Sequence, residues 1–165
     1  MKTVFAVTAI ALILPGAAHA ASAVMKSPDG KELGTLELVQ TGDGVSIKGT
    51  LSGIEPGIHA FHIHETGKCD APDFKSAGGH FNPHGAPHGK DGGGPHAGDM
   101  ENLHITDSSP QAISVVNAAV TLNPNGKTSL FDADGSAIVI HAGADDYSSQ
   151  PSGAAGGRVA CGVIQ

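Results

Sequence analysis

The 165-residue sequence has few aromatic residues, few basic residues and only one long apolar run. It contains no tryptophan, one tyrosine and five phenylalanines, so we expect one domain with a modest hydrophobic core. Nine lysines and arginines stand against 16 acidic residues, and the formal charge is -7. A nucleic-acid binder needs clustered basic residues to neutralise phosphates, so the composition argues against that class. An anionic substrate would have to be attracted by local positive charge rather than by net charge.

The long apolar run lies at the N-terminus. Lys2 precedes an apolar segment over residues 4–14, and a tripeptide with small outer residues follows and ends at Ala20. This order predicts a secretory signal peptide over residues 1–20 that is cleaved after Ala20. Loss of Lys2 would leave 8 basic and 16 acidic residues in the mature domain, residues 21–165, and change its formal charge from -7 to -8. A membrane-spanning helix needs about 20 apolar residues, so we expect a bacterial periplasmic protein without a membrane anchor; secretion from another cell type stays open.

Cysteine is scarce, since Cys69 and Cys161 are the only two. An oxidising compartment would let them persist as a disulfide, for which two cysteines allow one connectivity. Such a bridge would close a loop of about 92 residues, and the chain-entropy description gives it about 4–5 kcal/mol as an upper figure. A metal site with cysteine ligands is the alternative.

Glycine and proline, with 24 and 10 residues, divide the chain into short segments. Alternating or apolar segments between them predict β-strands at residues 35–40, 45–51, 58–64, 112–122, 129–131, 137–141 and 158–164. Residues 41–44 predict a hairpin loop between the first two strands. No amphipathic helix is indicated. Many short strands predict an all-β fold, an antiparallel sandwich or barrel.

Residues 65–103 interrupt this pattern with a stretch that is rich in glycine, proline and histidine and has no periodicity. A loop of this length inside a compact domain requires something functional or covalent to hold it. The candidates are Cys69 and the histidines.

Ten histidines outnumber the lysines and arginines together, and two of them share one strand. His62 and His64 point to the same face because strand side chains alternate, which sends Phe61 and Ile63 toward the core. His59 has the opposite parity, so we expect a hydrogen-bonded structural histidine there.

The long loop adds further donors, namely His80, His84, His88 and His96, with Asp99 three residues later. Interspersed prolines and glycines exclude a helix here, so a loop must arrange these side chains. Three imidazoles and a carboxylate suit a closed zinc site, whereas four nitrogen donors suit copper. His141 ends an apolar strand and is a further candidate donor. Solvated loop histidines without ordered pairing are the alternative.

Five segments combine these donors with their surroundings: residues 57–65 (GIHAFHIHE), 77–83 (AGGHFNP), 96–99 (HAGD), 139–145 (VIHAGAD) and 157–164 (GRVACGVI). In this order they resemble the copper,zinc superoxide dismutase family in its bacterial periplasmic form, over essentially the whole mature chain. The resemblance implies a Greek-key β-sandwich or barrel with long metal-binding and electrostatic loops. It also implies an oxidoreductase that converts superoxide to dioxygen and hydrogen peroxide by redox cycling of copper, while zinc is structural.

The resemblance implies one copper and one zinc ion per subunit, with ligands that can be named residue by residue. Copper would be held by His62, His64, His80 and His141. Zinc would be held by His80, His88, His96 and Asp99, so that His80 bridges both ions. The resemblance further implies that Asp145 hydrogen-bonds His62 and His88, that Arg158 attracts and positions superoxide, that His80 carries a proton during catalysis, and that Cys69 and Cys161 form the disulfide.

Several expectations concern residues outside this set. We hypothesise that Lys68 and Lys75 share the attraction of superoxide, because residues 142–157 contain no lysine. We expect His84 to face solvent and His104 to be structural or exposed. A copper-binding or copper-delivery module without turnover is the alternative function, and a disulfide-linked adhesion domain ranks last. The monomer and the homodimer both remain open.

Overall fold

The computed structural model describes residues 19–90 and 93–165, so residues 1–18 of the predicted signal peptide lie outside the described part. The described chain is built from β-strands and one short 3₁₀ turn, η1 (Lys75–Ala77). The strands are β1 (Ala20–Lys26), β2 (Glu32–Thr41), β3 (Gly44–Leu51), β4 (Gly57–His59), β5 (Phe61–His64), β6 (Leu103–Ile105), β7 (Gln111–Asn117), β8 (Ala137–His141) and β9 (Arg158–Val163). No helix in this part is long and apolar enough to cross a membrane.

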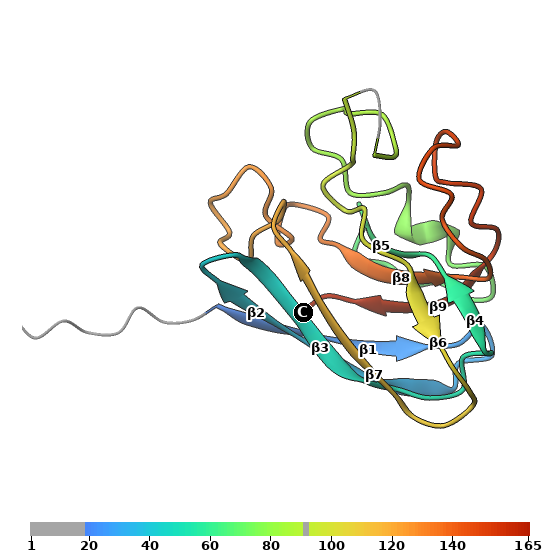
Figure 1. Cartoon of the computed structure of the whole chain (residues 1–165). Helices are drawn as coiled ribbons and strands as arrows, with labels where there is room; N and C mark the ends of the chain where they lie inside the picture. The colour runs from blue at the N-terminus through green and yellow to red at the C-terminus, as the bar shows by residue number, and fades with distance from the viewer. Residues whose placement is uncertain (1–18, 91–92) are drawn as a thin grey trace, which may run out of the picture.

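Seven strands form one antiparallel sheet in the order β5-β8-β9-β1-β2-β3-β7, while β4 and β6 pair separately. The sheet curls strongly, so that β5 and β7 at its two ends are far apart in the order but enclose a common interior (Figure 1). The predicted all-β fold is confirmed.

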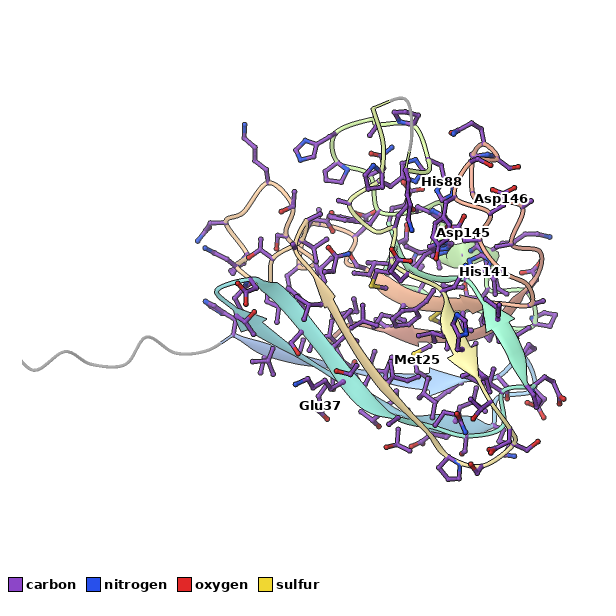
Figure 2. All side chains as sticks on the ribbon, in the orientation of Figure 1. Met25, Glu37, His88, His141, Asp145 and Asp146 are labelled. Carbon is purple, nitrogen blue, oxygen red and sulfur yellow. A yellow bond between two sulfur atoms is a disulfide. The ribbon has the colours of Figure 1, made fainter. Side chains whose placement is uncertain are left out.

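The core follows from strand alternation. In β2, Leu36 and Leu38 are fully buried, whereas Glu37 between them is exposed on the outer surface. Figure 2 shows Met25 of β1 inside the curl and Glu37 outside it. Burial of each large apolar side chain stabilises the fold by about 1.5–3 kcal/mol, so one buried face gives the sheet a rigid framework for the loops.

The strand predictions are confirmed for the hairpin and for the C-terminal strands. β8 and β9 lie where residues 137–141 and 158–164 predict them, and β2 and β3 meet in a two-residue turn. The predicted strand at residues 58–64 is wrong as a single element, because Ala60 separates β4 from β5 and sends them to different sheets.

Two further differences lie at the margins of the sheet. The predicted strand at 129–131 is wrong, since only an isolated bridge joins Thr121 and Ser129 there, and the strand predicted at 112–122 ends at Asn117. Both segments carry turn-forming residues that shorten the pairing. β1 and β6 were not expected, because one overlaps the predicted leader and the other has only three residues.

Two long loops rise side by side from one end of the sheet (Figure 1). One joins β5 to β6 and spans residues 65–102; the other joins β8 to β9 and spans residues 142–157. The disulfide between Cys69 and Cys161, with Cα atoms 5.7 Å apart, attaches the first loop to β9. This disulfide is a covalent attachment that holds the long segment, and it confirms the predicted pairing.

Candidate metal centre

The end of β5 supplies two histidines on one face. His62 and His64 are both buried, and the intervening Ile63 packs in the core. The long loop returns to this strand: the Ile63 amide donates to the Gly98 carbonyl over 2.9 Å, and the Phe81 amide donates to the Ile63 carbonyl over 2.8 Å. These bonds bring His80, which precedes Phe81, and Asp99, which follows Gly98, against β5.

Four imidazoles form the first cluster. Their ligand-capable atoms lie within 4.8 Å of one another, and all four residues are buried: His62, His64, His80 and His141. β5 contributes two of them, the loop one, and the end of β8 the fourth. Figure 2 shows His141 at the foot of the two loops.

Hydrogen bonds to the outer ring nitrogens decide which nitrogen faces inward. His64 Nδ1 donates to the Gly78 carbonyl over 3.0 Å, and His141 Nδ1 lies 3.3 Å from the Gly156 carbonyl oxygen. The two remaining Nε2 atoms face each other at 3.4 Å. His62 Nε2 donates to the Asp145 carboxylate over 2.8 Å, which leaves its Nδ1 buried and without a partner.

The second cluster contains His80, His88, His96 and Asp99, again with ligand-capable atoms within 4.8 Å of one another. The Nδ1 atoms of the three histidines lie 2.7, 2.9 and 3.3 Å, respectively, from Asp99 carboxylate oxygens. His80 belongs to both clusters: its Nδ1 faces Asp99, and its Nε2 is buried without a partner. One imidazole therefore connects the two groups.

Asp145 joins the clusters from the other side. Its two carboxylate oxygens accept hydrogen bonds from His62 Nε2 at 2.8 Å and from His88 Nε2 at 2.9 Å. Asn102 holds the Asp145 backbone with both amide atoms, each at 2.9 Å. Gly153 must lack a side chain, because a Cβ atom at this position would overlap the Asp145 carboxylate and lie 2.9 Å from His88 Nε2. Figure 2 shows Asp145 beside His88 and His141.

Burial lowers the pKa of three histidines in the first cluster. Desolvation lowers the pKa of His62, lowers that of His64 to about 2 and lowers that of His141 to about 4. Desolvation alone would raise the pKa of Asp99, but its hydrogen bond with His80 and the nearby histidine charges lower that pKa overall. Neutral imidazoles and an ionised carboxylate are the forms that bind metal ions.

Arg158 opens β9, and backbone carbonyls fix its guanidinium group. Its two terminal nitrogens donate to the carbonyls of Phe74 and Gly78, each over 2.6 Å. Gly78 also accepts the hydrogen bond from His64. The disulfide segment therefore positions both a histidine of the first cluster and the one arginine of the sequence.

The donor sets fit two different ions. The first cluster offers only imidazole nitrogens, which suit copper, and the second offers three imidazoles with a carboxylate, which suit zinc. Three buried ring nitrogens have no hydrogen-bond partner, namely His62 Nδ1, His80 Nε2 and His88 Nδ1. Buried polar atoms normally find partners, so these three nitrogens are available to bind metal ions.

The structure brings together all the histidines expected as ligands and leaves the others apart. His84 is exposed, as expected, and so is His104. His59 is buried, with its two ring nitrogens 2.7 and 2.9 Å from the carbonyl oxygens of His141 and Glu55, which confirms the prediction of a structural histidine. Asn102 and Gln150 hold backbone groups with their side-chain amides but belong to no sequence motif, so the sequence does not single them out.

An all-β sheet that carries a pair of histidine clusters joined by one imidazole defines a class of two-metal proteins. Comparison with known proteins identifies the family. The family model described as copper/zinc superoxide dismutase matches residues 32–164. Superoxide dismutase [Cu-Zn] 1 of Aquifex aeolicus is 53% identical over 138 residues, covering 82% of each chain, and Superoxide dismutase [Cu-Zn] 2 of the same organism is 46% identical over 171 residues and the full length of both. Superoxide dismutase [Cu-Zn] of Caulobacter vibrioides is 42% identical, covering 88% of this chain and 85% of its own.

Solved structures agree with this similarity. A SOD-like protein from Bacillus subtilis superposes with a TM-score of 0.84 at 36% identity, covering 87% of this chain and 97% of its own. Cu/Zn superoxide dismutase from Brucella abortus gives a TM-score of 0.71 at 28% identity, covering 89% of this chain and all of its own. The chain belongs to the copper/zinc superoxide dismutase family. It is an enzyme that converts superoxide to dioxygen and hydrogen peroxide, with copper and zinc as cofactors.

Proposed function

We propose that each residue of the two clusters has a defined role in this dismutation. Copper would bind His62 through Nδ1 and the other three histidines of its cluster, His64, His80 and His141, through Nε2. Zinc would bind Asp99 and the Nδ1 atoms of His80, His88 and His96. The partnerless state of His62 Nδ1 and His80 Nε2 carries this assignment, because both atoms are buried. Bound copper supplies a one-electron redox couple, whereas zinc has no redox chemistry.

Arg158 is the residue that binds and orients superoxide in this proposal. Two of its five N–H donors are used by the Phe74 and Gly78 carbonyls, and the guanidinium is half-buried rather than covered. Donors remain for a small anion, and the fixed positive charge counteracts the net charge of -7 locally.

His80 is proposed to carry a proton. Two superoxide anions and two protons give one dioxygen and one hydrogen peroxide, so each turnover consumes protons near the reacting oxygen. His80 Nε2 points into the copper ligand cluster, while Nδ1 stays against Asp99 at 2.7 Å. The ring can therefore hold and release a proton at Nε2 without losing its orientation.

The ligand assignment is tested by metal content. The variant His64→Ala should lose copper and keep zinc, and His96→Ala should lose zinc and keep copper, because each histidine belongs to one cluster only. His84→Ala is the matched control, since this exposed loop histidine belongs to neither cluster. Elemental analysis after dialysis measures both ions. A control variant that loses metal, or ligand variants that lose none, would contradict the assignment.

We infer a periplasmic location for the mature domain, residues 21–165, from the residues that precede it. A basic residue, an apolar run over residues 4–14 and small residues before Ala21 support cleavage after Ala20. The mass of the N-terminal peptide, measured on protein recovered from the periplasmic fraction of a bacterial host, tests this. Recovery of the uncleaved chain in the cytoplasm would overturn the inference.

A further inference from the structure

His88 lies in an irregular part of the long loop, yet its position must be accurate. Its ring donates from Nε2 to Asp145, and its Nδ1 faces Asp99 at 2.9 Å. Because both ring nitrogens face a carboxylate, the backbone of His88 can move little without breaking one of these contacts. Two other members of the cluster are fixed by backbone pairing with β5, since His80 forms a bridge with His64 and Asp99 forms one with His62.

The backbone of His88 is held instead by one side chain from the other loop. The His88 amide donates to Gln150 Oε1 over 2.9 Å, and Gln150 Nε2 donates to the His88 carbonyl over 2.7 Å. One primary amide thus satisfies both peptide groups of His88, and neither has a backbone partner in the described chain.

The residues beside this contact extend it. The Lys90 amide donates to the Tyr147 carbonyl over 3.1 Å. Gly89 lies so close to the same carbonyl that a Cβ atom would overlap it. Lys90 Nζ lies 3.8 Å from the centre of the Tyr147 ring and 2.9 Å from the Glu101 carboxylate. The segment at residues 88–90 is therefore fitted against residues 147–150, and Gln150 is the side chain in this contact that reaches the ligand itself.

We propose that Gln150 is a positioning residue for His88, an inference that rests on the zinc ligand set proposed above. Its amide fixes the His88 backbone so that Nδ1 points into the zinc cluster while Nε2 stays on Asp145. The loop between β8 and β9 thereby takes part in zinc binding without supplying a ligand. Partners outside the ligand shell typically change metal affinity by about 10- to 100-fold when they are removed.

The variant Gln150→Met tests this, because methionine keeps the length of the side chain and removes both hydrogen bonds. Gln40→Met is the matched control: Gln40 Oε1 accepts from the Leu122 amide and the Thr121 hydroxyl, and Nε2 donates to backbone carbonyls, at a place that is not in either metal cluster. Zinc affinity is measured by chelator competition, and the visible spectrum of Co²⁺ at the zinc site reports its ligand geometry.

We expect Gln150→Met to raise the zinc dissociation constant about tenfold and to change the Co²⁺ spectrum, while Gln40→Met leaves both at the wild-type values. Wild-type zinc affinity in Gln150→Met, or an equal loss in both variants, would overturn the inference. The variant His88→Ala separates this from failure of the ligand set. If His88→Ala binds zinc as tightly as the wild type, the assignment of His88 as a ligand is wrong. If His88→Ala loses zinc while Gln150→Met keeps the wild-type zinc affinity, only the role of Gln150 is overturned.

Discussion

At the scale of single residues, the hydrogen-bond partner of one ring nitrogen decides which nitrogen of His62 and of His64 faces into the first cluster. His64 is oriented by a backbone carbonyl and His62 by a carboxylate, and they consequently face inward with different nitrogens. Sequence parity on a strand predicts that both rings share a face. It does not predict which nitrogen binds, because the Gly78 carbonyl and Asp145 come from loops that have no periodicity.

The positive charge of Arg158 can be tested by removing it. Arg158→Ala should lower the bimolecular rate with superoxide by about tenfold or more, because local charge at a site can raise on-rates by about 10- to 1000-fold. Copper and zinc contents should stay at the wild-type values, since Arg158 belongs to neither cluster. Rates from pulse radiolysis, together with metal analysis of the same samples, check both parts. An unchanged rate at full metal content would remove Arg158 from the mechanism.

At the scale of elements, the sheet carries two irregular loops that hydrogen bonds and a disulfide attach to it. The disulfide between Cys69 and Cys161 and the hydrogen bonds of Ile63 fix the first loop. Most of the strands could be predicted because alternation is a local property of the sequence, and the members of the two clusters followed from the resemblance of the histidine-containing segments to a known family. The contacts of Asn102 and Gln150 could not, since an amide that holds a distant backbone group leaves no pattern around it.

The two lysines near the disulfide, Lys68 and Lys75, are expected to add to the attraction of superoxide. Both Lys68 and Lys75 are exposed, but Lys75 Nζ lies 2.7 Å from the Asp73 carboxylate, which offsets its charge. The pair Lys68→Gln and Lys75→Gln should lower the dismutation rate and flatten its dependence on ionic strength. Because of Asp73, we expect most of the effect from Lys68→Gln alone. Rates between low and physiological salt test this, and an unchanged rate in the double variant would contradict it.

At the scale of the whole molecule, an acidic protein must admit an anion. Its formal charge of -7 opposes superoxide at long range, so the attraction must come from the end of the sheet where the loops and Arg158 meet. Composition predicts that the net charge repels superoxide, but not where local positive charge offsets it. That position depends on Phe74 and Gly78, whose carbonyls hold a single guanidinium beside the histidine clusters.

The most direct test is superoxide dismutation by residues 21–165, with the copper and zinc contents determined on the same sample. We expect turnover near the diffusional range, about 10⁸–10⁹ M⁻¹ s⁻¹, that disappears when copper is removed and returns when copper is restored. One copper and one zinc bound tightly per chain with negligible turnover would contradict it, and would show that the clusters bind metal without catalysing the reaction.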